Sequence, residues 1–253
     1  MNKRIFLTYT ICNIVFVSFC FCYLYYYQAD LLSLMQYTYS DGQTHYNRLW
    51  GAVLTALLLL SVNLFAIRRN KDFHTFSAWT FFPSAILLTF ITGGRQTEDL
   101  NLSFGFIACI SLIAVCLYVI FSRYIRNFIR SNSEKINNNS LIKNLWINLL
   151  IITVQFMYVC AFSNSDRLFH ARLHLLQSLC EKDYDEALCT IGKLETSDRQ
   201  LTTLIVYTLS KKNVLAERLF EYPLRGGSVS LLPDSTLTSK FGFDEIYHHL
   251  NLK

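Results

Sequence analysis

Five apolar stretches without a charged residue constrain this chain more than any other feature of its sequence. They cover residues 5–27, 49–67, 73–92, 100–121 and 144–163, and none contains Asp, Glu, Lys or Arg. A helix of about 20 residues crosses the roughly 30 Å hydrocarbon core of a bilayer, because it rises about 1.5 Å per residue. A large soluble protein can bury one uncharged helix, but five in a chain of 253 residues predict a membrane domain over residues 1–163.

The first and third stretches each allow another interpretation. The first follows the basic start MNKR, as the core of a signal peptide does. It is longer than a usual core of roughly 7–15 residues and ends in YLYYYQ, without a small-residue cleavage site, so we interpret it as an uncleaved signal anchor. The third stretch includes His74 and Pro83, so a tilted or re-entrant segment is the alternative to a full crossing there.

The distribution of basic residues predicts the orientation. Cytoplasmic loops of membrane proteins keep most of the Lys and Arg. With a cytoplasmic N-terminus, ten of the twelve basic residues of the membrane part fall on the cytoplasmic side, and the other two are Arg48 and Arg95. Five crossings then place residues 164–253 on the far side, which is the periplasm for a bacterial inner (cytoplasmic) membrane.

The tail that follows the last stretch differs from the rest, because charged and apolar residues alternate there with helical spacing. Ser165 or Asp166 can cap one helix and Asp183 a second, and a short turn between them predicts a helix pair. The predicted fold is all-α, with about five membrane helices followed by a small extracytoplasmic helical-hairpin domain over residues 164–253.

The predicted turn resembles part of a tetratricopeptide repeat. The run KDYDEAL is similar to the turn and second-helix start of such a repeat, which implies that Tyr184 packs at the corner and that Ala187 allows close helix contact. The sequence departs from the pattern at Leu175, where a small residue is expected. A second helix pair is predicted over residues 198–211 and 214–222, after a spacing of 29 residues where that repeat has about 34.

The end of the tail carries a second resemblance. The run LSKKNVLAERLFEYP, then SLLP and EIYHHLNL, is similar to an uncharacterised family of multi-pass membrane proteins from Bacteroidota-type bacteria. The resemblance implies apolar N-terminal helices before a periplasmic helical region. In that family the last segment is followed by further helices, so we expect this chain to be a short or truncated member. The family has no established activity, so no residue inherits a role.

Two of the eight cysteines lie in the tail, and we single out Cys180 and Cys189 as a candidate disulfide. They flank the predicted turn, and a periplasmic location permits a bridge if their Cα atoms come within about 7 Å. Two buried thiols that pack the helix pair are the alternative. The other six cysteines lie in apolar stretches, and the sequence has no CxxC motif.

The sequence contains no motif for a catalytic, cofactor or metal site, so none of these is predicted. His170 and His174 are four residues apart but lack a third ligand. Asp41, His45 and Arg48 form the only plausible outward polar group, and it is a weak one. No nucleic-acid partner is expected, because the formal net charge of +5 arises from the membrane part, with 12 basic and 6 acidic residues, and not from the tail, with 11 and 12.

Polar residues inside the apolar stretches predict hydrogen bonds between helices. They are amides without an ionisable partner, which disfavours a proton-coupled transporter. Those that we single out are Asn13, Asn63, Asn148 and Gln155.

The sequence favours an integral inner-membrane protein in contact with lipids, whose residues 164–253 serve as an interaction or scaffold module for a protein partner. A membrane enzyme or carrier acting on lipid or glycan at the outer face is the alternative, and a nonfunctional fragment is a third interpretation. The absence of a catalytic motif favours a non-enzymatic role.

Overall fold

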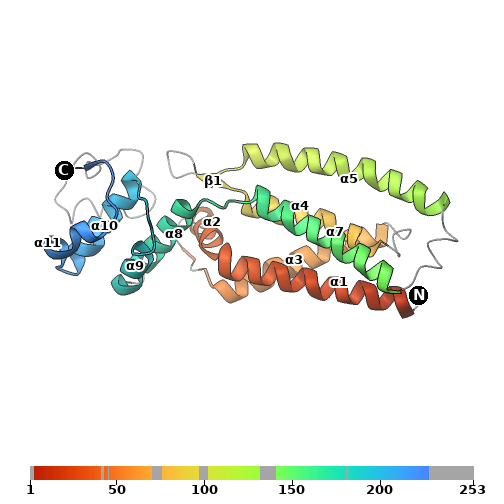
Figure 1. The fold of residues 1–253 in the computed structure, drawn as a ribbon, viewed down its shortest axis with the longest axis horizontal. Coiled ribbons are helices and arrows are strands. Elements are labelled where there is room, and N and C mark those ends of the chain that lie inside the picture. Colours follow the sequence, from red (N-terminus) through yellow and green to blue (C-terminus); the bar gives the residue numbers. More distant parts are fainter. Residues whose placement is uncertain are drawn as a thin grey trace. The chain divides into compact units, whose positions relative to one another are not determined.

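The computed structural model describes residues 3–40, 43–44, 46–69, 76–96, 102–131, 141–180 and 182–227. The described chain is helical (Figure 1), which agrees with the predicted all-α class. The extended backbone in the described part is a ladder of two short strands, β1 (Arg95–Gln96) and β2 (Leu102–Ser103), which lie between two helices of the membrane part.

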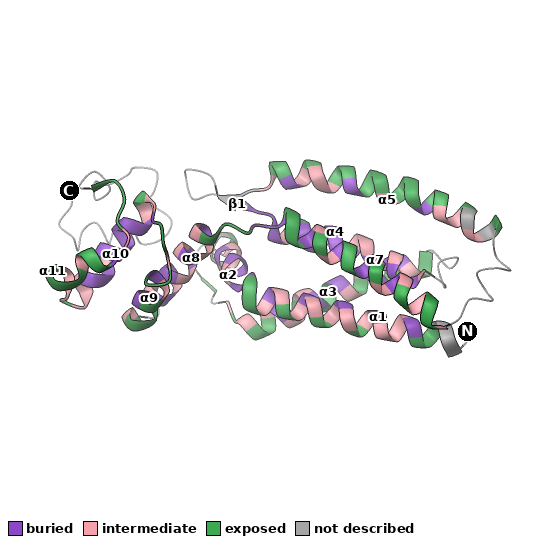
Figure 2. Ribbon diagram, in the orientation of Figure 1, coloured by how far each residue is buried: buried purple, intermediate pink, exposed green. Residues whose placement is uncertain are grey.

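Four helices are long and apolar enough to cross a membrane, and this confirms the membrane character of the chain. They are α1 (Lys3–Cys22) with its continuation η1 (Tyr23–Tyr27), α3 (Arg48–Arg69), α5 (Gly105–Ser131) and α7 (Leu141–Phe162). Much of their surface is exposed (Figure 2), although the exposed side chains are largely apolar. An apolar exterior of this kind is suited to lipid and not to water.

The fifth predicted stretch is shorter than these four. It forms a 3₁₀ turn, η3 (Ser77–Phe81), which continues into α4 (Phe82–Thr92). Residues 73–75 at the predicted start lie outside the described part of the chain. Pro83 lies in the first turn of α4, where a helix has no use for its N–H group, so the proline starts this helix and does not kink it.

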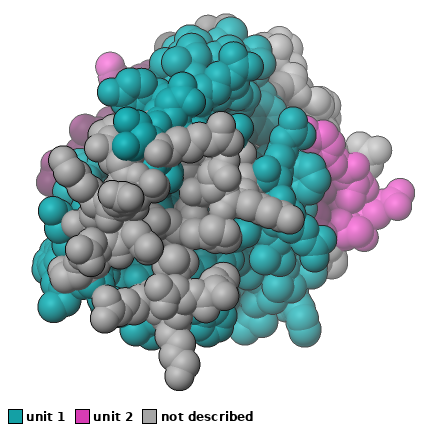
Figure 3. All heavy atoms as spheres, turned by 90° about the vertical axis from the view of Figure 1, so that its right-hand side faces the viewer, with its two compact units in different colours: residues 1–32, 46–95, 103–164 teal, residues 33–45, 96–102, 165–253 magenta. Residues whose placement is uncertain are grey.

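The described chain divides into two compact units (Figure 3). The first, called the bundle below, contains Met1–Leu32, Tyr46–Arg95 and Ser103–Asn164. The second contains Ser33–His45, Gln96–Leu102 and Ser165–Lys253. Helix α2 (Ala29–Tyr39) begins in the first unit and ends in the second. Its segment lies between the first two apolar stretches, where the sequence predicts a connection on the side opposite the N-terminus.

Helices α1 and α7 run in the same direction. Near the middle of both helices, the rings of Phe19 and Phe156 stack with centroids 3.7 Å apart. Farther along, the Tyr23 hydroxyl bonds to the Ser163 hydroxyl. Helix α3 runs the opposite way, since Arg48 at its start pairs with Asp30, which follows α1.

Helix α4 runs parallel to α7 and antiparallel to α5. Its 3₁₀ start meets the end of α5, where Trp79 Nε1 donates to Ser122 Oγ over 2.7 Å. Its last turns meet the start of α5, where the rings of Phe90 and Phe104 have centroids 5.7 Å apart. A Cβ atom on Gly93 would lie 2.6 Å from Ile107 Cγ1, so the glycine permits this close approach. The helices of the bundle therefore alternate in direction along the chain.

The tail contains α8 (Arg167–Cys180), α9 (Tyr184–Ile191), α10 (Arg199–Lys211), α11 (Leu215–Arg218) and η4 (Leu219–Glu221). The predicted caps are present. Leu168 N–H donates to Asp166 Oδ1 at 2.9 Å, and Glu186 N–H donates to Asp183 Oδ1 at 3.0 Å. These bonds satisfy amides that the first turn of a helix leaves unpaired.

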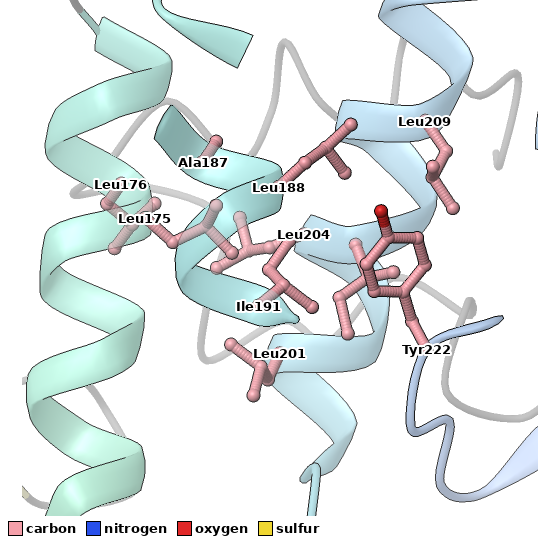
Figure 4. Packing of buried hydrophobic residues seen from close by; sticks show 10 residues of the cluster. Leu175, Leu176, Ala187, Leu188, Ile191, Leu201, Leu204, Leu209 and Tyr222 are labelled. Carbon is pink, nitrogen blue, oxygen red and sulfur yellow. The ribbon is translucent and has the colours of Figure 1, made fainter. Parts of the chain in front are cut away.

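The tail helices share one apolar core (Figure 4). Its members come from α8, α9 and α10, with Tyr222 from the segment after η4. They are Leu175, Leu176, Ala187, Leu188, Ile191, Leu201, Leu204, Ile205, Leu209 and Tyr222. Leu175, which stands where a small residue was expected, is fully buried in this core.

The helix predicted over residues 214–222 is shorter than expected. The α-helix covers only Leu215–Arg218, and a 3₁₀ turn follows it. Ala216, which the predicted spacing of 29 residues aligns with the buried Ala187, is exposed. Four α-helical residues make about one turn, so this segment does not present a second face for close packing.

Candidate functional site

A group of neutral polar residues, called the junction cluster below, joins the end of α7 to the ends of α1 and α4. Its members are Tyr23, Gln28, Thr92, Gly94, Ser163 and Asn164. They come from the end of α1, the loop after α4 and the end of α7. These elements meet because the three helices run in the same direction. The cluster lies immediately before the tail begins.

Asn164 bonds through its backbone and through its side chain. Its N–H donates to Thr92 O at 2.9 Å, and its Nδ2 donates to Gly94 O at 2.9 Å. Its carbonyl accepts from Gln28 Nε2 at 3.1 Å. These bonds satisfy backbone groups at the ends of α4 and α7 that the helices cannot pair internally. These hydrogen bonds hold Asn164, the last residue of the bundle, in place against α4 and the end of α1.

A π-helical turn brings α1 into this cluster. Gln28 N–H donates to Tyr23 O at 3.1 Å, five residues back, as in a π-helix. The Gln28 amide is fully buried and also donates to the Tyr23 hydroxyl at 2.9 Å. Its Oε1 accepts no hydrogen bond from the described residues. The cluster can hold a chain end and accept one more donor, but it contains no group that could transfer a proton near neutral pH.

A second group of buried amides joins α7 to η3. Asn148 Oδ1 accepts from Ala78 N–H at 2.8 Å, and Gln155 Nε2 donates to Ala78 O at 2.9 Å. These two predicted interhelical bonds are present, and both go to backbone. Asn63 differs, since it is fully buried and its side chain bonds to no backbone group in the described residues; its polar neighbour is the Tyr9 hydroxyl. The Oδ1 of Asn13 has no hydrogen-bond partner there.

The tail contains two turns with the same hydrogen-bond pattern. After α8, Lys182 N–H donates to Leu179 O and Asp183 N–H donates to Ser178 O. After α10, Asn213 N–H donates to Ser210 O and Val214 N–H donates to Leu209 O. Both are Schellman motifs, in which a left-handed residue ends a helix.

The left-handed residues of these turns are Lys182, with φ 61°, and Asn213, with φ 58°. They are 31 residues apart, so the two turns align at that spacing and not at the predicted 29. The difference arises because the prediction aligned Ala187 with Ala216, whereas the turns align at their hydrogen bonds.

Ion pairs connect the tail helices around the apolar core. Arg172 Nε lies 3.5 Å from Asp198 Oδ2, and His174 Nε2 lies 3.6 Å from Glu186 Oε1, a contact that is ionic only when the histidine is protonated. Lys212 pairs with the exposed Asp185. These pairs join α8 to the start of α10, α8 to α9 and α9 to the end of α10. Exposed pairs contribute little stability, so their effect is mainly to favour one arrangement of the helices.

The residues singled out from the sequence lie in different places. Asp41 and His45 lie outside the described residues, and Arg48 pairs with Asp30 at 3.4 Å. The proposed outward polar group therefore stays a prediction. In the tail, Ala187 is fully buried and Tyr184 is half-buried.

The candidate disulfide also stays a prediction. The Cys189 thiol is exposed and free in the structure, and the side chain of Cys180 lies outside the described part. In the described residues no group of three or more His, Cys, Asp or Glu is placed to hold a metal ion.

Comparison with family models, with curated proteins and with solved structures finds no match for this sequence. The function is therefore inferred from the fold and the geometry of the site.

Proposed function

We propose that this chain is an integral membrane protein with five crossings, which presents its tail helices as an interaction or scaffold module on the side opposite its N-terminus. In a bacterium this means the inner membrane, with the N-terminus in the cytoplasm and the tail in the periplasm. The observation that carries the interaction role is the helix pair α8 and α9, packed with α10 on one shared core. Helix pairs stacked in this manner are used in proteins to bind peptides and other helices.

The direction of the bundle helices supports five crossings. Helices α3 and α5 both run opposite to α1 and α7. The chain leaves α3 at one end of the bundle and enters α5 at the other, so the segment between them must travel the length of the bundle. Residues 77–92 do so, with Ala78 beside Asn148 and Thr92 beside Asn164. This segment needs no greater length, because the other helices surround it.

The charges at the two ends of the bundle support the orientation. The end where α1 and α7 begin, and where α3 and α5 finish, is called the basic end below. Its described basic residues are Lys3, Arg4, Arg68, Arg69, Arg123, Arg126, Arg130 and Lys143. The other end, with the junction cluster, has Arg48, Arg95 and the single described carboxylate of the bundle, Asp30. Basic residues favour the cytoplasmic face.

A series of alkaline phosphatase fusions tests the topology, because this reporter is active only outside the cytoplasm. We expect inactive fusions after residues 69 and 131 and active fusions after residues 94 and 227. An inactive fusion at 94 together with an active one at 131 would mean that residues 77–92 do not cross, and the proposed topology would be wrong.

The interaction role is tested by crosslinking in cells that express the full chain. A photoreactive amino acid at Cys189, which is exposed on α9, should give a discrete adduct with a protein partner. The matched control has the same probe together with Leu204→Ala, which disrupts the shared core and should abolish the adduct. An adduct that survives the core substitution would argue against recognition by folded tail helices.

A membrane enzyme or carrier acting on lipid or glycan at the outer face is the second candidate. Its support is Gln28 Oε1, which accepts no bond from the described residues, although Gln28 is fully buried and a substrate would reach it only after a rearrangement. The junction cluster is also neutral, and its described neighbours Asp30 and Arg48 pair with each other. Activity that survives deletion of residues 165–253 would favour this candidate over the scaffold.

A further inference from the structure

The seam between α4 and α5 at the basic end has the features of a site for a phosphate group with hydrocarbon attached. Five basic side chains at this end are described, those of Arg68, Arg69, Arg123, Arg126 and Lys143, and the one described carboxylate of the bundle, Asp30, lies at the opposite end. The acidic residues of the adjoining loops, Asp72 and Glu134, lie outside the described residues. The described surface therefore attracts anions.

Trp79 forms one wall of this seam. Its ring stacks on that of Tyr118 with centroids 5.7 Å apart and an angle of 18° between the planes. Its Nε1 donates to the Ser122 hydroxyl over 2.7 Å, and Ser122 is buried. The Tyr118 hydroxyl lies beside Ser122 and within the field of the Arg126 guanidinium. The wall is thus built from defined contacts between η3 and α5.

Arg123 and Arg126 lie in the last turns of the apolar span, which covers Gly105–Asn127, and Arg126 is near the Tyr118 hydroxyl of this wall. The two arginines are three residues apart, so they lie on neighbouring positions of one helix face. The Arg123 side chain is exposed, and Arg126 is half-buried. Arginines at the end of a membrane helix extend toward the headgroup layer, and a guanidinium can make paired hydrogen bonds to phosphate.

The surface of α5 toward the membrane centre is apolar and uncovered. Only 17% of its span is buried, against 22% to 28% for the other three long helices. Large apolar side chains are exposed along it, namely Leu112, Ile113, Leu117, Ile120 and Phe121. Figure 2 shows this helix with little purple along its length. A phosphate bound at the arginines would thus have hydrocarbon-binding surface directly next to it.

We propose that Arg123 and Arg126, with the Trp79 wall beside them, bind the headgroup phosphate of an anionic phospholipid whose acyl chains lie along the exposed face of α5. Inorganic phosphate would use only the arginines, and a zwitterionic lipid would bring its own cation to a basic surface. The anionic lipid alone matches both parts of the surface. This site is independent of the role proposed for the tail.

Native mass spectrometry of the full chain in detergent tests the proposal, with phosphatidylglycerol, phosphatidylcholine and inorganic phosphate titrated separately. We expect phosphatidylglycerol to bind most tightly. Arg123→Gln should weaken its binding on the order of fivefold, and Arg123→Gln with Arg126→Gln should weaken it further, since a basic residue near the headgroups contributes that much. The matched control is Arg68→Gln with Arg69→Gln, at the same end of the bundle, which should keep the affinity.

Three results would overturn the lipid site: equal binding of both lipids, an equal loss in the control variant, or binding of inorganic phosphate as tight as that of phosphatidylglycerol. A second measurement leaves the arginines intact, in case their replacement prevents folding. With Trp50→Phe and Trp146→Phe, Trp79 is the only tryptophan of the chain. Phosphatidylglycerol with brominated acyl chains should quench its fluorescence more than brominated phosphatidylcholine does, and equal quenching would contradict the proposal.

Discussion

The interactions that stabilise the bundle differ from those that stabilise the tail. In the bundle, buried amides of Asn148, Gln155 and Asn164 bond to backbone groups of other helices. In the tail, leucines and two isoleucines from three helices fill most of one core, and hydrogen-bonding side chains cap the helix ends. Water drives apolar side chains together, whereas lipid does not, so helices in a membrane associate through packing and polar contacts. We therefore expect the tail to be most sensitive to loss of an apolar core residue and the bundle to loss of a buried amide.

The largest effect is expected from the tail core. Leu204 is fully buried, so Leu204→Ala leaves a cavity and should destabilise the tail by about 2–5 kcal/mol. Hydrogen exchange of the full chain measures this, as faster exchange of amides in α8, α9 and α10. Amides of α1 and α7 should exchange as before, because the core cluster draws its members from the tail alone. Faster exchange in those helices would break the distinction between the two regions.

The next effect is expected from a buried amide of the bundle. Asn148→Leu removes the acceptor of the Ala78 N–H and should destabilise the bundle by about 1–3 kcal/mol, the usual cost of a buried donor without a partner. Thermal unfolding in detergent measures it.

Asn63→Leu is the matched control for that substitution. Asn63 is as buried as Asn148, but its side chain bonds to no backbone group in the described residues and has only the Tyr9 hydroxyl as a polar neighbour, so the leucine should cost less stability than Asn148→Leu does. If both variants lose the same stability, polar bonds do not distinguish the bundle from the tail.

A smaller effect is expected at a helix cap of the tail. Asp198 Oδ1 accepts from Leu201 N–H at 2.8 Å, and Oδ2 lies 3.5 Å from Arg172 Nε. Asp198→Ala should therefore destabilise α10 by about 0.5–2 kcal/mol. Asp198→Asn keeps an oxygen for the cap and loses the charge, so it should recover most of the loss. Exchange rates of the amides at the start of α10 measure both, and an equal loss in the two variants would show that the ion pair matters more than the cap.

The smallest effect is expected at the left-handed turns. Lys182 has φ 61°, a conformation that costs a residue with a Cβ atom about 1 kcal/mol or more and costs glycine little. Lys182→Gly should thus stabilise the first hairpin by up to about 1 kcal/mol, as slower amide exchange in α8 and α9. Asn213→Gly is the control, and it should gain less because asparagine tolerates this conformation. A loss of stability at Lys182 would mean that its side chain contributes more than its backbone costs.

Local signals in the sequence predicted much of the secondary structure. Uncharged apolar runs located the long membrane helices, and Asp166 and Asp183 marked the helix starts of the tail. These signals depend on residues within one turn of each other or on one run of composition, so no knowledge of the folded chain is needed to use them.

Features that depend on tertiary contact could not be predicted in the same way. Asn148 was expected to bond between helices, but nothing near it in the sequence indicates that its partner is the backbone of Ala78, 70 residues away. The junction cluster was missed because each of its members is an ordinary polar residue at the end of a helix. Gln28 is a lone amide after four tyrosines at the end of an apolar run, which marks it as unusual in the sequence. Only the π-helical turn of the folded chain shows that it points into the cluster.

The alternating directions of the bundle helices have a consequence for how the protein is made. Residues 77–92 are synthesised before α5 and α7, yet their polar backbone groups and aromatic side chains contact those two helices. The two amide partners of Ala78 are 70 and 77 residues later in the chain, so Ala78 has neither of them when it is first synthesised. We therefore expect this short segment to take its place in the bundle only after α7 has been synthesised.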